Sequence, residues 1–150
     1  MAISYEGLAW ITGAAIVLGG DLPSAPILII ALLYSIGAHG IMTLNDFKSV
    51  EGDLQMGIRS LPAQLGRERA AKVACLFMLL PQLAVITLLL HWQLAPHAAA
   101  VTVVVVAQCL AMKRLLSDPK ELAPWYNATG VSLFVLGMMS AAVGLGGWFA

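Results

Sequence analysis

Four long apolar runs, separated by short polar segments, dominate the chain. They cover residues 26–44, 73–92, 95–112 and 128–149. Each approaches the ~20 apolar residues that a helix needs to cross ~30 Å of hydrocarbon. A fifth run, at 8–20, is shorter, because its 13 residues rise only ~20 Å at ~1.5 Å per residue. The pattern predicts an all-α, polytopic transmembrane helical bundle of about five spans.

The composition supports membrane insertion. Of the 150 residues, 60% are hydrophobic and 11% are charged, whereas an average soluble domain has about 25% charged residues. The formal net charge is zero, so no global positive field indicates nucleic acid as a partner. We therefore expect residues 1–150 to form a single transmembrane domain in contact with a lipid bilayer.

The positive charges lie in only two of the polar segments. All eight Lys and Arg residues occur between the first and second long runs or between the third and fourth. If every run crosses the membrane, these two segments are on the same side, and the positive-inside rule places them in the cytoplasm. We therefore predict that residues 45–72 and 113–125 are cytoplasmic and that the C-terminus is outside.

The polar stretch NDFKSVEGD, residues 45–53, begins where the first long run ends. If the helix continues past Leu44, then Asp46, Ser49 and Asp53 share one face, because spacings of three and four residues keep to one side of a helix. Two carboxylates on one face suit Mg²⁺, which prefers oxygen ligands and often bridges to substrate phosphates. The spacing therefore predicts a magnesium site at the end of this span.

Two basic residues near this stretch are candidate ligands for a phosphate. Lys48 lies within it and Arg59 follows it, and both can donate charge-assisted hydrogen bonds to phosphate oxygens. On a continuous helix Glu51 falls roughly 140° from Asp46, so we expect Glu51 to lie outside the site. A solvated loop, whose acids pair with nearby Lys and Arg, explains the same pattern equally well. Spacing alone leaves both interpretations open.

The sequence also resembles a known family over nearly the whole chain. The stretch NDFKSVEGD is followed by MGIRSLPAQLG, and the segments SYEGLAWITGAA and DPKELAPWYNATGVSLFVLGMM occupy residues 4–15 and 118–139. Together they resemble the chlorophyll and bacteriochlorophyll synthases of the membrane prenyltransferase family. The fold of that family is a bundle of nine spans with two aspartate-rich motifs that face a central cavity. Only the second motif is present here, so the resemblance implies the C-terminal half of such a bundle, and we expect an N-terminal half to be missing.

The second motif of the family has the general pattern N-D-x-x-D-x-x-x-D. Four residues occupy its defined positions in this chain: Asn45, Asp46, Ser49 and Asp53. Ser49 stands in place of the middle acid. The resemblance implies that Asp46 and Asp53 are catalytic and hold Mg²⁺ through a prenyl diphosphate. It implies that the diphosphate itself is bound by three residues: Asn45, Lys48 and Arg59.

The reaction that the resemblance implies is prenyl transfer to a tetrapyrrole. The propionate carboxylate of a (bacterio)chlorophyllide attacks a geranylgeranyl or phytyl diphosphate and so acquires its ester tail. Mg²⁺ and basic side chains would stabilise the departing diphosphate. Such an enzyme is expected in the cell inner membrane or in a photosynthetic intracytoplasmic membrane. The alternative is a truncated, non-catalytic relative that binds pigment or assembles with other photosynthetic membrane proteins.

Three further polar residues are candidates for the substrate cavity. His39 lies seven residues before Asp46 and therefore on roughly the same face of a helix. An ionisable residue within a span indicates a functional site by default, and His39 could contact the tetrapyrrole or its central metal. A packing histidine bonded to a neighbouring backbone is the alternative, which we favour at this point. Tyr126 and Asn127 open the last span, where an interfacial aromatic belt is the alternative.

Overall fold

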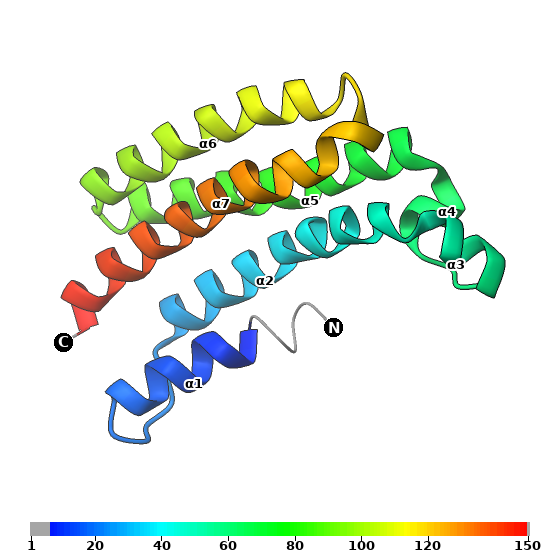
Figure 1. Ribbon diagram of the computed structural model, residues 1–150. Helices are drawn as coiled ribbons and strands as arrows, with labels where there is room; N and C mark the ends of the chain where they lie inside the picture. The colour runs from blue at the N-terminus through cyan, green and yellow to red at the C-terminus, as the bar shows by residue number, and fades with distance from the viewer. Residues whose placement is uncertain (1–6, 150) are drawn as a thin grey trace.

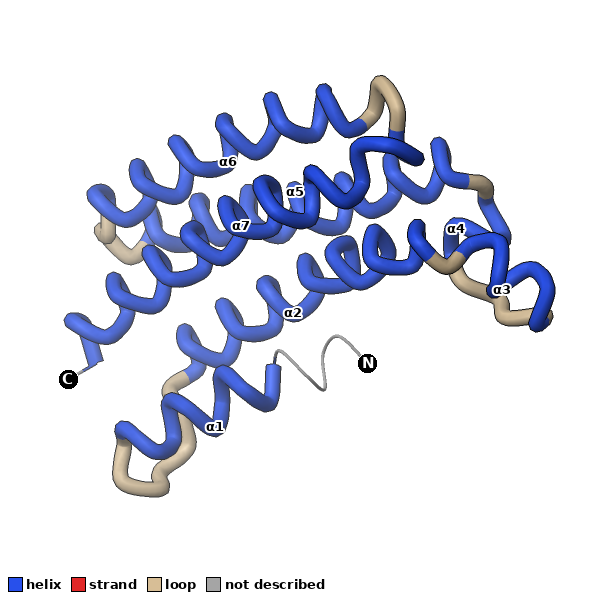
Figure 2. Tube along the Cα trace, in the orientation of Figure 1, coloured by secondary structure: helices blue, strands red, loops and turns tan. Residues whose placement is uncertain are grey.

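The computed structural model describes residues 7–149, with side chains for residues 7–146. Residues 4–6, which begin one of the segments that resemble the family, lie outside this described part. Helices and loops make up the described chain, with no strand, so the all-α prediction is confirmed (Figure 2). The helices are α1 (Leu8–Val17), α2 (Ala25–Asn45), η2 (Asp46–Lys48), α3 (Val50–Met56), α4 (Leu61–Leu65), α5 (Arg67–His91), α6 (Ala95–Leu115) and α7 (Pro119–Phe149).

Four helical segments have the length and hydropathy to cross a membrane, as the apolar runs predict. They are Ala25–Lys48, which combines α2 and η2, then Arg67–His91, Ala95–Leu115 and Pro119–Gly146. The remaining apolar run forms a shorter helix, because α1 has 10 residues and rises only ~15 Å at ~1.5 Å per residue. The described residues therefore contain four candidate spans and one shorter apolar helix.

Proline marks the start of three of these four segments. Pro26 and Pro96 lie in the first turns of α2 and α6, and Pro119 is the first residue of α7. A proline is favoured there because its missing N–H would have no intrahelical acceptor in the first turn. The positions of these residues explain why the apolar runs become separate helices joined by short loops.

The four long helices lie roughly side by side (Figure 1). Helix α2 packs against α5 and α7, and α6 packs against α7 and α5. Helix α1 lies beside α2 at one end of the bundle, and the short helices α3 and α4 lie at the opposite end. Trp10 of α1 stacks on Tyr34 of α2 with ring centroids 6.1 Å apart. Its indole N–H also donates to the sulfur of Met138 in α7 at 3.2 Å.

Two glycines let α2 approach its neighbours closely. A Cβ atom at Gly40 would lie 2.4 Å from the carbonyl oxygen of Ala74 in α5, and one at Gly37 would lie 2.6 Å from the ring of Phe134 in α7. In lipid there is no hydrophobic driving force between helices, so small residues stabilise their association by allowing the backbones to pack closely. These two contacts fix where the end of α2 lies relative to the other spans.

A pair of buried glutamines joins the middle of three helices. The amide nitrogen of Gln82 in α5 donates to the side-chain oxygen of Gln108 in α6 at 2.7 Å and to the carbonyl of Met78 at 2.9 Å. The amide nitrogen of Gln108 in turn donates to the carbonyl of Gly130 in α7 at 3.4 Å. Both side chains are buried, so this glutamine pair is an internal polar contact within an apolar bundle.

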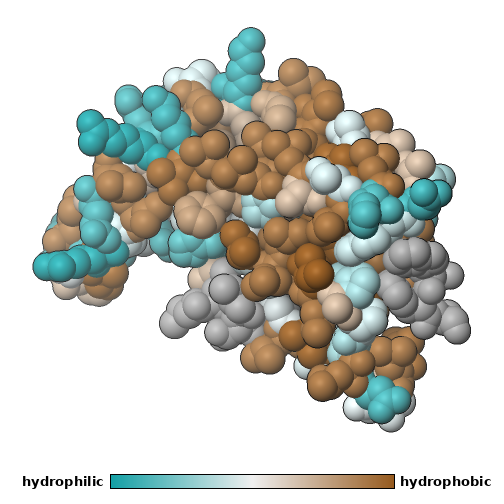
Figure 3. Space-filling view, turned by 180° about the vertical axis from the view of Figure 1, so that it is seen from behind, coloured by the Kyte–Doolittle hydropathy of each residue, from teal (hydrophilic) through white to brown (hydrophobic). Residues whose placement is uncertain are grey.

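The positively charged residues gather at one end of the bundle. The segment that carries α3 and α4 lies at the same end as the loop between α6 and α7 (Figure 1). The prediction that the two basic segments are on the same side is therefore confirmed. Hydrophobic residues cover most of the face seen in Figure 3, and hydrophilic residues gather toward its margins.

Candidate functional site

The aspartate segment, which we define as residues 45–60, is not a continuation of α2. The α-helix ends at Asn45, a 3₁₀ turn follows, and Ser49 has φ −111° and ψ 3° before α3 begins. The Ser49 hydroxyl donates to the carbonyl of Asp46 at 3.1 Å, and the Ser49 N–H donates to the same carbonyl at 3.0 Å. Such local side-chain bonds compete with the helical ladder. The assumption of a continuous helix past Leu44 is therefore wrong.

The carboxylate of Asp53 is held by two hydroxyls. The Ser60 hydroxyl donates to Oδ2 of Asp53 at 2.5 Å, and the Ser49 hydroxyl donates to the same oxygen at 3.4 Å. Asp53 is only 9% exposed. Gly57 ends α3 in the left-handed conformation, at φ 68°, which a glycine adopts without a steric cost. This turn brings Ser60 back beside Asp53.

Asp46 lies close enough to Asp53 and His39 to interact electrostatically with both. Its half-buried carboxylate forms no hydrogen bond or ion pair with another described residue. Ser49 bonds to the backbone carbonyl of Asp46 and to the carboxylate of Asp53, so these three residues lie in one region although the backbone between them is bent. Neither aspartate is neutralised by a basic side chain of the described protein.

Glu51 has a different environment from these two aspartates. Its carboxylate accepts a hydrogen bond from the Arg67 guanidinium at 2.5 Å, which is the one ion pair within residues 7–146. This hydrogen bond lowers the pKa of Glu51, and the nearby charge of Lys120 lowers it further. Glu51 is thus already paired within the protein, unlike Asp46 and Asp53.

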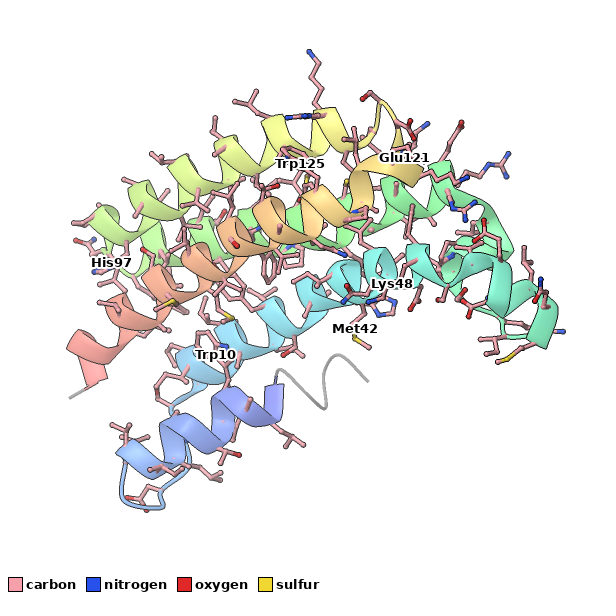
Figure 4. The ribbon with its side chains drawn as sticks, viewed as in Figure 1. Trp10, Met42, Lys48, His97, Glu121 and Trp125 are labelled. Carbon is pink, nitrogen blue, oxygen red and sulfur yellow. The ribbon has the colours of Figure 1, made fainter. Side chains whose placement is uncertain are left out.

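A small pocket lies between the end of α2 and the start of α7. It has a volume of about 290 Å³, and its polar lining residues are Asn45, Lys48, Lys120 and Asn127. The amide nitrogen of Asn127 donates to the side-chain oxygen of Asn45 at 3.0 Å. Lys48 of η2 and Glu121 at the start of α7 lie at the same end of the bundle (Figure 4). The structure therefore brings Asn45, Lys48 and Asn127 together.

Two residues in this region were not identified from the sequence. Ser60, which contacts Asp53, lies in the quoted stretch MGIRSLPAQLG. Lys120, which lines the pocket with Lys48, lies in the quoted stretch DPKELAPWYNATGVSLFVLGMM. Their presence in motifs shared with the family was the available signal, but neither spacing nor residue type distinguished them from ordinary loop residues.

The remaining candidates lie apart from this pocket. Arg59 is exposed after α3, and its guanidinium forms no ion pair with a described residue. His39 is exposed on α2, with its ring edge-on to Phe77 at a centroid distance of 5.1 Å. Tyr126 is fully buried in the core and lies over Gly130, so it lines none of the pockets described here. Its neighbour Trp125 lies under the Arg114 guanidinium, 4.3 Å from the ring centre.

The fold and this site define a class of protein. The chain is a multi-pass membrane protein, with four candidate spans and two unneutralised aspartates at the end of one of them. It belongs to the UbiA prenyltransferase family, whose sequence model matches residues 2–136.

Individual relatives agree with this assignment. The chain is 57% identical over 147 residues to the bacteriochlorophyll synthase 33 kDa chain of Cereibacter sphaeroides, covering 98% of this chain and 48% of the relative. It is 50% identical to the protein of the same description in Rhodobacter capsulatus, covering 99% and 49%. The chloroplastic chlorophyll synthase of Avena sativa is 35% identical, covering 95% and 37%. The chain thus spans about half the length of these curated relatives, or less. No solved structure matches it.

Proposed function

We propose that this chain supplies the second aspartate site of a membrane prenyltransferase that esterifies a (bacterio)chlorophyllide. The observation that carries this proposal is that Asp46 and Asp53 interact electrostatically and that neither forms an ion pair with a basic side chain of the described protein. The similarity to bacteriochlorophyll and chlorophyll synthases supports the choice of substrate. The donor would be geranylgeranyl or phytyl diphosphate.

The donor set fits Mg²⁺. Both hydroxyls that contact Asp53 bond to Oδ2, which leaves Oδ1 without a hydrogen bond from the described protein. The described residues hold no cluster of three or more His, Cys, Asp or Glu side chains. A site of one or two carboxylates completed by substrate phosphates is the usual arrangement for Mg²⁺. When bound, the ion would neutralise negative charge on the diphosphate.

The protein residues have separable roles in the proposed reaction. The carboxylate oxygen of the tetrapyrrole propionate forms a bond to the allylic carbon, while the bond from that carbon to the diphosphate oxygen breaks. Lys48 and Lys120, at the pocket between α2 and α7, would donate hydrogen bonds to the diphosphate that leaves, and Arg59 would add positive charge from the following loop. No general base is required, because a carboxylate is already ionised near neutral pH.

We propose that the aspartate segment faces the cytoplasm and that the membrane is the cell inner membrane or its photosynthetic intracytoplasmic extension. The support is the gathering of basic residues at one end of the bundle, because such residues favour the cytoplasmic side. A cysteine at Ala63 is expected to react with an impermeant thiol reagent from the cytoplasmic side, and a cysteine at Ala95 from the outside. The opposite labelling of both sites would reverse the proposed orientation.

The activity is tested by combining this chain with the amino-terminal half that its relatives contain and this chain does not. We expect the 150-residue chain alone to transfer no prenyl group. Together with the amino-terminal half of the Cereibacter relative, it should form pigment ester from chlorophyllide and prenyl diphosphate. The same pair carrying Asp46→Asn is the control. Pigment binding without any ester would instead favour a non-catalytic pigment-binding protein, and turnover by the chain alone would contradict the need for a second motif.

A further inference from the structure

His39 is an unusual residue for its position in the fold. It lies six residues before the end of α2 at Asn45, which is ~9 Å at ~1.5 Å per residue. It is exposed rather than buried among the spans. An ionisable side chain at such depth is costly in a bilayer unless it faces a partner, a cavity or a ligand.

The imidazole of His39 forms no hydrogen bond within the described protein that would explain its position. The polar contact at His39 is made by its backbone, whose carbonyl accepts from the Thr43 hydroxyl at 3.0 Å. The ring itself is oriented by an edge-to-face contact with Phe77, which is 38% exposed. The packing histidine bonded to a neighbouring backbone, which the sequence favoured, is therefore not what the structure contains. Neither ring nitrogen has a hydrogen-bond partner among residues 7–146.

The imidazole also lies in register with the proposed catalytic carboxylate. His39 of α2 and Asp46, the first residue of η2, are seven residues apart, which is ~10 Å along a helical axis, and they interact electrostatically. Met42 lies between them in sequence and projects from α2 away from α7 (Figure 4). Together, Met42 and Phe77 give this face an apolar surface beside His39.

This arrangement matches the two ends of a chlorophyllide. The centre of a tetrapyrrole and the end of its propionate arm are separated by a distance comparable with that between His39 and Asp46. The macrocycle is flat and apolar, and its central Mg²⁺ accepts an axial ligand above the ring plane. A neutral imidazole is a common metal ligand.

We propose that a ring nitrogen of His39 is the axial ligand of the tetrapyrrole's central Mg²⁺, so that the propionate is directed toward the diphosphate near Asp46. The nitrogen lone pair binds the Mg²⁺ and displaces water from it, and no other bond changes. The inference rests on the proposed function for its substrate class. It adds a binding and orienting residue that the aspartate motif does not contain.

The test compares a Mg²⁺-containing chlorophyllide with the same pigment lacking its metal. The full chain is used in membranes together with the amino-terminal half of the Cereibacter relative, and binding is followed by the visible absorption of the pigment, which responds to axial ligation. The variant is His39→Ala, with and without added imidazole. His91→Ala is the matched control, because His91 is an exposed histidine at the far end of α5.

The expected result is a loss confined to the metal-containing pigment. His39→Ala should lower its affinity at least about tenfold, which is ~1.4 kcal/mol, and should shift its absorption, while binding of the metal-free pigment stays unchanged. Added imidazole should restore the absorption, and His91→Ala should behave as the unaltered protein. Equal losses for both pigments would show that His39 only packs the site and would overturn the inference.

The outcomes also separate this inference from the proposed function. If the unaltered protein forms ester and His39→Ala keeps the unaltered absorption and affinity, axial ligation fails and the prenyltransferase function stands. If the unaltered protein binds neither pigment and forms no ester, the proposed substrate fails and the inference fails with it.

Discussion

The glutamine pair and the aspartate segment are both polar, but they use their polar atoms differently. Gln82 and Gln108 are buried in the middle of the bundle, where their amide groups bond to each other and to backbone carbonyls of α5 and α7. In the aspartate segment, Oδ1 of Asp53 and the carboxylate of Asp46 have no hydrogen-bond or ion-pair partner among the described residues. The glutamine pair uses its polar atoms within the protein except for Oε1 of Gln82, which is buried without a partner in residues 7–146, whereas the aspartate segment leaves these carboxylate oxygens unused at the polar end of the bundle.

This difference separates a structural role from a binding role. In hydrocarbon, a polar group without a partner costs several kcal/mol, so the hydrogen bonds that both amide nitrogens donate inside the bundle offset most of the cost of burying the glutamines. At the end of a span, water can satisfy a carboxylate until a ligand replaces it. Substitutions of carboxylates that have no partner, at the end of the bundle that holds the aspartate segment, are therefore expected to affect catalysis. Substitutions of the hydrogen-bonded glutamines should affect stability.

The largest expected effect is on turnover, from Asp46→Asn or Asp53→Asn. Each change removes a negative charge that the proposed Mg²⁺ site needs, while keeping the size of the side chain. With the amino-terminal half of a relative supplied, turnover should fall at least about 100-fold, the scale seen when one preorganised contact to developing charge is lost. Rates are measured as a function of Mg²⁺ concentration, and the midpoint of thermal unfolding should change little.

Ser60→Ala provides a graded control for this pair. It removes the shorter of the two hydroxyl contacts to Asp53 but no charge, so turnover should fall by less than in either aspartate variant. If both aspartate variants keep near-normal rates and the same dependence on Mg²⁺, the segment is a solvated helix end and the catalytic role assigned to it is wrong.

The next largest effect is on stability, from the glutamine pair. Gln108→Leu removes the inter-helix partner of the Gln82 amide and the side-chain donor to the Gly130 carbonyl, and should cost about 1 kcal/mol, near the values measured for hydrogen bonds between membrane helices. The double variant with Gln82→Leu should lose less than the sum of the two single variants, because no buried amide is then left unpaired. Midpoints of thermal unfolding in detergent test this.

Thr87→Val is the matched control for the glutamines. The Thr87 hydroxyl bonds only to the carbonyl of Leu83 on its own helix, so its removal should leave the midpoint almost unchanged. A loss of turnover in the glutamine variants without a loss of stability would contradict the comparison, because it would assign a catalytic role to the pair that lies in the middle of the bundle.

The spans could be predicted from the sequence because lipid leaves the backbone few choices. A helix satisfies its own N–H and C=O groups, so an apolar run of sufficient length is enough to locate α2, α5, α6 and α7. The hydrogen bond between Gln82 and Gln108 could not be predicted in this way. It joins residues 26 positions apart, and only the packing of α5 against α6 brings them together.

The site could be predicted in part. The pattern of Asn45, Asp46 and Asp53 identified the segment, because residue type and family motif agree there. The bend at Ser49 was missed, since it depends on a hydroxyl that competes with the helical hydrogen bonds. Ser60 was missed because its contact with Asp53 requires the reversal of the chain at Gly57.

The smallest expected effect on turnover and stability is that of Glu51→Gln. Glu51 is the acid of the aspartate segment that is already paired with a basic residue. Its hydrogen bond with Arg67 lowers the pKa of Glu51 below the ordinary value of 4.5. A carboxyl whose pKa is lowered by folding contributes stability above that ordinary value and loses the contribution as the pH falls through the lowered one. Glu51 is 64% exposed in this pair and Arg67 23%, so solvent screening keeps the contribution small.

Glu51→Gln should therefore leave turnover and Mg²⁺ dependence unchanged. The variant should unfold at a slightly lower temperature than the parent near pH 7, and the difference should vanish below the pH at which Glu51 becomes protonated. Arg67→Gln, alone and combined with Glu51→Gln, shows whether the effect belongs to the pair. A fall in turnover as large as that of Asp46→Asn would break the distinction between paired and unpaired acids, because Glu51 would then act in catalysis despite having a partner in the protein.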